Sequence, residues 1–388
     1  MTAITIALLA LPAAALGYAY VLYPVGLWCL VRLTRAGAAV RDEVEWPEIT
    51  VTIPVHNEER TLRSTLELVL ALDYPAHRRH VLVISDASTD GTDEIARTFG
   101  DRGVRLVRLP SRAGKTAAEN AAVPYLRGEI VVNVDAAARP AISSLRALVA
   151  TFADPTVGVA SGRDVSLGTG DADTGTGESG YVGYEMWVRD LETRMGSIVG
   201  ASGCFFAVRR ALYEERLPEA LSRDFASAMI AREHGLRSVS VHAAVCGVPR
   251  ALSMDAEFRR KVRTMHRGLE TLWYKRALLN PVVYGRFAVM LFSHKLCRWL
   301  VPLTLPLGAL GLALLAMRSP VAASLLGVVI TALALSAMVA WRPGPALERR
   351  GVRLPSYLLM SSIAGIVAWW EALRQKRESM WEPTRRPV

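Results

Sequence analysis

An apolar run ends in one aspartate at Val131-Val132-Asn133-Val134-Asp135. A carboxylate at the end of a buried strand is suited to hold a divalent cation against a diphosphate, because Mg²⁺ is bound through one or two carboxylates together with phosphate oxygens. One carboxylate performs this task less well than two. The value of Asp135 as a ligand for Mg²⁺ or Mn²⁺ therefore depends on the polar residues that the fold places around it.

Polar residues also follow three other strand-like segments. They are His56-Asn57-Glu58, Asp86 to Thr92, and Arg112 to Lys115. Lys115 stands at the expected start of a helix, where the helix dipole and the ammonium both favour a phosphate group. Asp86 is suited to accept hydrogen bonds from a uracil or ribose edge, with Glu58 on the neighbouring loop. Asp90 is interpreted as a helix cap instead.

The segments between these polar groups alternate between strand and helix patterns. Strands are predicted at 49–54, 80–85, 104–109 and 129–135, and helices at 58–72, 92–99 and 115–126. This alternation favours an α/β fold with a parallel, doubly wound, Rossmann-like sheet. Because ligands bind beyond the carboxyl ends of the strands in such sheets, the four polar groups are expected to meet at one site.

Further elements are predicted downstream: a helix at 184–195, a turn and strand at 200–210, a helix at 222–234, a strand at 237–248 and a basic helix at 256–276. The stretch 168–183 between two of them holds six glycines, so we predict a mobile surface loop, with a lid as the alternative. It contains Asp171-Ala172-Asp173, but no apolar strand leads into that pair to hold it rigid. We therefore do not assign a metal site there.

Four long segments carry no charge, at 4–31, 299–317, 321–341 and 354–370. The first lacks a basic start and a small-residue cleavage site, which favours an uncleaved membrane anchor over a signal peptide. We predict an anchor at 1–33, a linker at 34–48, a catalytic domain at 49–276 and an interfacial amphipathic segment at 277–298. A C-terminal transmembrane region at 299–372 then precedes a basic tail at 373–388, and its last apolar segment either spans or re-enters the membrane.

The net charge of +10 arises mainly from basic residues that flank these apolar segments. This distribution fits positive-inside flanks beside anionic membrane lipids, with the catalytic domain on the cytosolic face. It does not fit a nucleic-acid surface, which would interleave basic residues with exposed aromatic residues on a soluble domain. The four cysteines match no zinc spacing and are expected to be reduced.

The order of the segments resembles that of membrane-bound family 2 glycosyltransferases with a GT-A fold. The resemblance covers residues 49–270 and rests on Ile53 to Glu58, Ser85 to Thr92, Gly114-Lys115 and Asp135. Three later segments are similar to a branch that assembles bacterial polysaccharides and glycolipids. They are Phe258 to Arg263, Ser293-His294-Lys295 and Trp381 to Arg385.

The resemblance implies a role for each matching residue. Asp224 falls at the position of the catalytic aspartate, and the general-base role would be to take a proton from the acceptor hydroxyl. The acceptor side is implied to be Gly200, Ala201, Ser202 and Gly203. The nucleotide-sugar set is His56, Asn57, Glu58, Asp86, Lys115, Asp135, Arg260 and Arg263, with Asp135 also the ligand of Mg²⁺ or Mn²⁺. Arg260 and Arg263 share one helix face and could both reach a diphosphate, whereas Arg259 and Arg267 are interpreted as facing the membrane.

Two positions depart from the family pattern. Ala137 stands where relatives often carry a second metal ligand, so water must replace a protein ligand there. Thr264 follows Arg263 where polymerising relatives carry tryptophan, which points toward one sugar per acceptor or a short product.

The expected function is that of an inverting glycosyltransferase at the cytosolic face of the cell membrane. It would move a sugar from a nucleotide-diphosphate sugar, with UDP favoured, to a lipid-linked or glycan acceptor. Membrane lipids are expected partners, and a homo-oligomer or an assembly complex is a further possibility. The alternatives are a processive polysaccharide synthase, or a non-catalytic member that binds nucleotide sugar and scaffolds an assembly complex.

Overall fold

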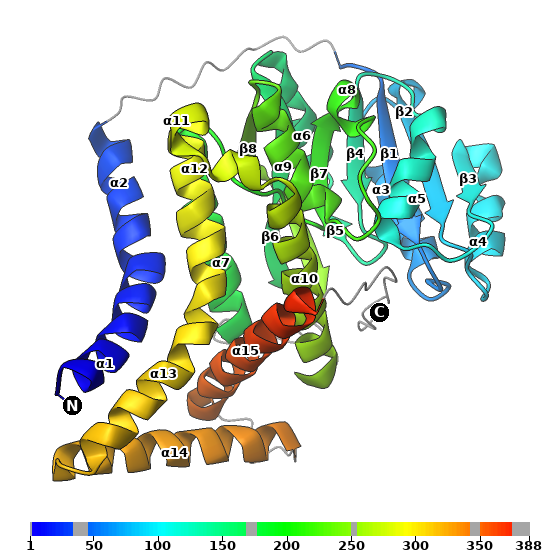
Figure 1. The fold of residues 1–388 in the computed structure, drawn as a ribbon. Coiled ribbons are helices and arrows are strands. Elements are labelled where there is room, and N and C mark those ends of the chain that lie inside the picture. Colours follow the sequence, from blue (N-terminus) through cyan, green and yellow to red (C-terminus); the bar gives the residue numbers. More distant parts are fainter. Residues whose placement is uncertain (1, 34–45, 168–176, 250–253, 342–349, 375–388) are drawn as a thin grey trace.

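The computed structural model describes residues 2–33, 46–167, 177–249, 254–341 and 350–374 (Figure 1). Within these residues, eight strands form one sheet in the order β3-β2-β1-β4-β7-β6-β8-β5. Their bounds are Ile49–Val55 (β1), Arg79–Ser85 (β2), Val104–Arg108 (β3), Ile130–Val134 (β4), Arg139–Pro140 (β5), Val157–Leu167 (β6), Phe205–Arg209 (β7) and Arg237–Pro249 (β8).

The first four strands confirm the predicted parallel arrangement. β1 pairs in parallel with both β2 and β4, and β2 pairs in parallel with β3. Every residue of β1 is buried, as expected for a central strand covered on both faces. The carboxyl ends of these strands therefore lie along one edge, where their polar residues follow.

The remaining strands show that a uniformly parallel sheet was the wrong prediction. β7 runs antiparallel to both β4 and β6, and the short β5 runs antiparallel to β8. β6 and β8 are parallel to each other. The sheet is therefore mixed, because the alternation of strands and helices fixes an α/β fold but does not fix the direction of each strand.

Helices pack against both faces of the sheet (Figure 1). One core contains Val51 and Val83 of the sheet and Leu66 of α3 (Leu62–Ala71), with α4 (Thr92–Thr98) and α6 (Ser144–Ala150). The other core contains Ile84 and residues of α5 (Lys115–Ala122), α8 (Arg210–Tyr213) and α9 (Arg223–Glu233). These two layers hold the strand ends in place.

The loop predicted for the glycine-rich segment 168–183 ends earlier than expected, because a helix begins inside it. Helix α7 spans Gly177–Arg194, so it begins before the predicted position 184 and includes three of the six glycines. Asp171-Ala172-Asp173 lies outside the described residues. The predicted lid role therefore applies at most to the part that precedes α7.

Helices from both ends of the chain extend away from the sheet (Figure 1). They are α1 (Thr2–Gly17), α2 (Tyr23–Leu33), α10 (Met254–Tyr274), α11 (Pro281–Tyr284), α12 (Arg286–Leu291), α13 (Arg298–Ala316), α14 (Pro320–Trp341) and α15 (Arg350–Leu373). α1 packs against α13 at small residues: a Cβ on Gly311 would lie 2.9 Å from the Leu8 Cβ. Such close approach is common between helices in membranes, although it occurs elsewhere too.

Among the described residues, two continuous helices are long and apolar enough to cross a bilayer, Ala3–Leu33 and Arg286–Ala316. The core helix of a soluble protein or a signal sequence can pass the same test. The second helix begins at Arg286 and so includes most of the segment that the sequence suggested as interfacial, 277–298. His294 and Arg298 of this segment are buried and pair with Glu185 of α7. The domain bounds themselves stay a prediction.

Candidate active site

A cavity of about 430 Å³ lies at the carboxyl ends of β1 and β4. Its walls also come from the starts of α5 and α9, from the segment before β7, and from α7, α10 and α13. The cavity brings together most of the predicted site residues. They are Glu58, Lys115, Asp135, Gly200, Ala201, Ser202, Gly203, Asp224, Arg260 and Arg263.

Lys115 and Asp135 form an ion pair at the centre of this cavity. Nζ of Lys115 donates to Oδ1 of Asp135 at 2.6 Å and to the carbonyl of Gly203 at 3.2 Å. Gly114 before the lysine has φ of 96°, a left-handed conformation that side chains rarely adopt, so this turn favours glycine. The sequence Gly-Lys thus places the ammonium between two strands of the sheet.

The charge of Lys115 is strongly stabilised. Burial alone would lower its pKa, but the carboxylates of Asp135, Glu119 and Asp224 outweigh this effect and raise the pKa above its usual value. Glu119 is buried beneath the same site, and its burial raises the pKa of its carboxyl against the opposing effect of Lys115 and Arg223. Lys115 therefore stays a cation in the presence of a diphosphate.

His56, Asn57 and Asp86 do not line the cavity. Both oxygens of Asp86 accept backbone N–H groups, from Ala113 at 2.7 Å and from Gly114 at 2.8 Å, and the residue is fully buried. Nδ1 of His56 lies 2.7 Å from the carbonyl of Asp86. In this structure Asp86 supports the loop before Lys115, and its contact with the nucleotide stays a prediction.

Two other residues of these loops also serve the local structure. Asn57 has φ of 53°, and its side-chain oxygen accepts the amide of Thr89 at 2.8 Å. Asp90 accepts the amide of Thr92, the first residue of α4, at 3.1 Å, so its side chain contacts the start of that helix, whose N-cap is Gly91. Glu58 is the member of this group that lines the cavity, and its Oε2 accepts the hydroxyl of Thr61 at 2.6 Å.

Asp224 lies in the first turn of α9 and lines the same cavity as the Lys115–Asp135 pair. Its Oδ1 accepts the hydroxyl of Ser222, the residue that precedes the helix. A Cβ on Gly203 would lie 3.0 Å from its Oδ2, so the absent side chain leaves room for this carboxylate. The structure thus brings the predicted base next to the predicted acceptor segment.

The acceptor segment is held by a carboxylate that sequence reasoning missed. The Ser202 hydroxyl lies 2.6 and 2.8 Å from the two oxygens of Asp164, and the Ser202 amide donates to Ser161 Oγ at 2.8 Å. Burial raises the pKa of Asp164, against the opposing effect of Arg189 and the Ser202 hydroxyl. Asp164 lies inside strand β6, so no strand end or motif marked it.

Several other cavity residues were also missed: Glu119, Tyr181, Glu185, Arg189 and Trp299. Lys295, which the resemblance named without a role, lines the cavity as well. The apolar-to-polar transition that marked the strand ends does not occur around them. The charged residues of α7 were the one signal in the sequence that could have pointed to the cavity. A helix with a solvent-exposed face has the same composition, so this signal does not identify a site.

Three arginines of α10 lie near the cavity, and one of them differs from its predicted role. Arg260 and Arg263 line the cavity, and Arg260 is held by two contacts of 2.7 Å to Glu257. Arg267 was predicted to face the membrane, but it is buried in the cavity wall and donates to the Thr116 hydroxyl at 2.8 Å. Arg259 pairs instead with Asp255 on an exposed part of the helix, at 2.5 Å.

The donor set fits a divalent metal only if the substrate supplies most of the ligands. Among the described residues, no group of three or more histidine, cysteine, aspartate or glutamate side chains is arranged to hold a metal ion. Asp135 faces the cavity, and Ala137 beside it has no donor atom. Mg²⁺ usually keeps several waters and binds through one or two carboxylates plus phosphate oxygens, so Asp135 can serve in that way.

The mixed α/β sheet with Lys115, Asp135 and Asp224 at one cavity is a GT-A-like arrangement. Residues 50–217 match the family model for glycosyl transferase family 2. This part of the chain is therefore similar to family 2 glycosyltransferases, as the sequence resemblance implied.

The fold is also similar to that of a solved relative. The mannosyltransferase PcManGT of Pyrobaculum calidifontis, in complex with GDP-Man and Mn²⁺, superposes with a TM-score of 0.72 at 25% identity, over 96% of this chain and 99% of that one.

Curated relatives match shorter stretches. An N-acetylglucosaminyltransferase of Rhizobium sp. (strain N33) is 29% identical over 174 residues, which cover 42% of this chain and 38% of the relative. The dodecaprenyl-phosphate galacturonate synthase of Rhizobium johnstonii is 33% identical over 99 residues, or 24% of this chain and 29% of the relative. The chain thus spans well under two thirds of these curated relatives.

Proposed function

We propose that this protein is an inverting glycosyltransferase that moves a sugar from a nucleotide-diphosphate sugar to an acceptor hydroxyl. The observation that carries the proposal is the placement of Lys115, Asp135 and Asp224 at one cavity, where Lys115 and Asp224 both adjoin Gly203 of the predicted acceptor segment. This arrangement puts a cationic place for a diphosphate close to a carboxylate that can serve as the base. The family 2 match and the fold shared with a mannosyltransferase support the same activity.

The residues suggest the following reaction. Asp224 takes the proton of the acceptor hydroxyl as its oxygen attacks the anomeric carbon from one side. The bond from that carbon to the diphosphate breaks on the opposite side, and its electron pair leaves on the terminal phosphate oxygen. This direct displacement inverts the anomeric configuration. Lys115 and the two arginines of α10 offset the charge that develops on the leaving diphosphate.

A divalent metal is part of the proposal. Asp135 would hold Mg²⁺ or Mn²⁺, which supplies further charge neutralisation to the diphosphate when bound. Mn²⁺ in the mannosyltransferase complex supports this assignment. The ammonium of Lys115 already pairs with the same carboxylate at 2.6 Å, so donor binding is expected to shift Lys115 toward the phosphates.

We further propose that the reaction takes place at the cytosolic face of the cell membrane, on a lipid-linked or glycan acceptor. The long apolar helices Ala3–Leu33 and Arg286–Ala316 support a membrane location. The donor nucleotide is a proposal too: UDP remains the expectation, and GDP belongs in the same assay because the mannosyltransferase neighbour binds GDP-Man.

The test is an assay of the purified full chain in detergent. UDP-, GDP- and TDP-sugars would be screened for hydrolysis or transfer, with Mg²⁺, Mn²⁺ or a chelator. Turnover with one donor, and its loss in Asp224→Asn, are the expected results. Nucleotide binding without any turnover would contradict the proposed activity and favour a non-catalytic role.

A further inference from the structure

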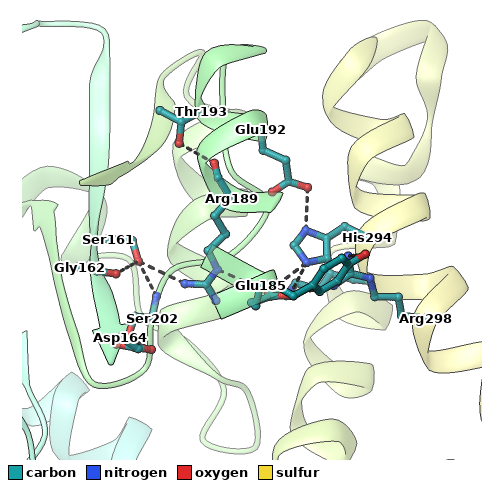
Figure 2. A network of polar contacts seen from close by, with 12 residues as sticks. Ser161, Gly162, Asp164, Glu185, Arg189, Glu192, Thr193, Ser202, His294 and Arg298 are labelled. Carbon is teal, nitrogen blue, oxygen red and sulfur yellow. Dashed lines mark hydrogen bonds and ion pairs between the residues drawn. The ribbon is translucent and has the colours of Figure 1, made fainter. Parts of the chain in front are cut away.

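The Ser293-His294-Lys295 motif lies on a π-helical turn, Phe292–Cys297, between α12 and α13. Single π-helical turns inside α-helices often occur at functional sites. Nδ1 of His294 is 2.7 Å from Oε1 of Glu192, and Nε2 is 2.9 Å from Oε2 of Glu185 (Figure 2). Each ring nitrogen of His294 therefore faces a carboxylate of α7.

Glu185 of α7 is the centre of this cluster, because four basic groups converge on its carboxylate (Figure 2). His294 and Arg298 make the shorter contacts, at 2.9 and 2.8 Å. Lys295 Nζ and Arg189 Nε both approach Oε1, from 3.3 and 3.5 Å. One carboxylate therefore serves four cationic groups, and Lys295 and Arg189 are held more loosely than the other two.

Arg189 is a buried cation whose hydrogen-bonding capacity is only partly used. It is 8% exposed, and its Nη1 reaches Ser161 Oγ at 3.4 Å. Within the described part of the chain its Nε makes no hydrogen bond, and its ion-pair contact with Oε1 of Glu185 is long, at 3.5 Å. A guanidinium held this loosely in the wall of a cavity is available to an acceptor atom of a ligand.

Both cations line the cavity on the acceptor side. A Cβ on Gly200 would lie 3.6 Å from Cε of Lys295, so the lysine stem runs along the acceptor segment. Arg189 reaches the same segment through Ser161, which accepts the Ser202 amide (Figure 2). The Lys115–Asp135 pair lies at the Gly203 end of this segment, because Lys115 also donates to the Gly203 carbonyl, and it is assigned to the donor diphosphate.

We propose that Arg189 and Lys295 form a subsite for the phosphate of a lipid-linked acceptor. This inference rests on the proposed function and narrows it: the acceptor is a sugar joined to its lipid through a phosphate or diphosphate. A guanidinium and an ammonium flanking one point suit the charge and oxygen geometry of a phosphate. Neutral glycolipids and free glycans carry no group that uses both cations.

The direction of the helix supports a lipid source for this phosphate. Lys295 belongs to the apolar helix Arg286–Ala316, and Trp299 one turn further also lines the cavity. α13 then continues away from the sheet (Figure 1). A lipid lying along this helix would bring its phosphate to Lys295 first, with the attached sugar directed toward Asp224.

The experiment measures binding of two probes to the full chain in detergent. One probe is N-acetylglucosamine joined to a short prenyl chain through diphosphate, and the other is octyl N-acetylglucosaminide, which is neutral. UDP and UDP-glucose binding are measured in parallel. The variants are Lys295→Gln and Arg189→Gln, the charge-retaining Lys295→Arg, and the control Lys261→Gln on α10, which lies outside the cavity lining.

The wild type is expected to bind the diphosphate probe at least about tenfold more tightly than the neutral one. Each glutamine variant should lose about tenfold of that affinity, because a charged hydrogen-bonding partner is removed. Lys295→Arg and Lys261→Gln should stay within about threefold, and nucleotide affinity should not change. If a glutamine variant fails to fold, the wild type is tested at low and high salt instead. Its affinity for the diphosphate probe should fall at high salt, because salt screens the attraction between the two cations and the phosphates.

Equal affinity of the wild type for both probes would overturn the proposal. So would an unchanged affinity in Lys295→Gln, or a parallel loss of nucleotide affinity. If the diphosphate probe binds as expected and no nucleotide binds, the subsite stands and the proposed transferase function fails.

Discussion

Nζ of Lys115 lies 2.6 Å from Oδ1 of Asp135, so the first residue of α5 is joined to the residue that follows β4. The same carboxylate is the proposed ligand of a divalent metal. A metal ion and the ammonium would compete for this oxygen, and the donor diphosphate offers the ammonium another partner. Metal binding and donor binding are therefore expected to be mutually dependent.

A second carboxylate beside Asp135 should strengthen metal binding. We expect Ala137→Asp to lower the Mn²⁺ concentration for half-maximal turnover by about tenfold, because water is replaced by a charged ligand. A titration of donor turnover against Mn²⁺ and Mg²⁺ measures this, with Ala141→Asp on an exposed turn as the control. Turnover that survives in Asp135→Ala but not in Asp224→Asn would contradict the metal assignment.

Loss of the Asp224 carboxylate should abolish proton transfer without affecting donor binding. We expect Asp224→Asn to lower kcat by about 10²–10⁴-fold, the usual contribution of a general base. Steady-state kinetics and UDP binding are the measurements, and Asp101→Asn on an exposed turn is the matched control. A variant that keeps more than a tenth of wild-type kcat would exclude Asp224 as the base.

Asp86 should matter for stability as well as for the site. Asp86→Asn replaces one accepting oxygen with an N–H₂ that faces a backbone N–H, so we expect a loss of about 1–3 kcal/mol in unfolding free energy. Weaker nucleotide binding should accompany it, because the loop before Lys115 loses its support. Asp73→Asn removes a half-exposed ion pair to Arg146 and should cost about 0–1 kcal/mol. Equal effects in the two variants would contradict this role.

A methyl group at Gly203 should displace the carboxylate of Asp224, the proposed base. Its Cβ would lie 3.0 Å from Oδ2 of Asp224, so the carboxylate must move by a few tenths of an ångström. We expect Gly203→Ala to lower kcat by about tenfold or more, since small displacements of catalytic groups are costly, with nucleotide affinity unchanged. Gly183→Ala, where no atom lies within 4 Å of the new Cβ, is the control. If Gly203→Ala kept the wild-type kcat, the packing of Gly203 against the Asp224 carboxylate would not matter for turnover.

Glu185 should give the protein a distinct acid sensitivity. Burial alone would raise its pKa, but His294, Lys295 and Arg189 outweigh this and hold the pKa well below the usual value. A carboxyl with a depressed folded-state pKa contributes stability that is fully present above its unfolded pKa and is lost as pH falls through the folded one. Glu185→Gln should therefore unfold at a lower temperature than wild type above about pH 4.5, with a smaller difference in more acidic solution.

Thermal unfolding of both proteins across pH 3 to 8 checks this. Asp154→Asn, at an exposed ion pair with Arg237, serves as the comparison. A gap between wild type and Glu185→Gln that does not narrow below about pH 4.5 would contradict the depressed pKa.

The sequence by itself determined the parallel half of the sheet and the core of the site. Each of its strands is a short apolar run that ends in polar residues, and parallel strands bring those ends to one edge. Local sequence was therefore sufficient to select Lys115, Asp135 and Glu58. Asp224 and the Gly200–Gly203 segment came from the family resemblance, and the structure places them in the same cavity.

Tertiary structure alone decided how the rest of the cavity is built. Asp164 lies inside a strand and Glu185 and Arg189 inside a helix, so no local pattern separates them from ordinary charged residues. Arg267 turned inward and Asp86 was buried because partners far away in the chain, Thr116 and the Ala113–Gly114 amides, were available to them. The direction in which a side chain points and its burial depend on contacts between distant segments. These contacts form only when the sheet and the helices pack together.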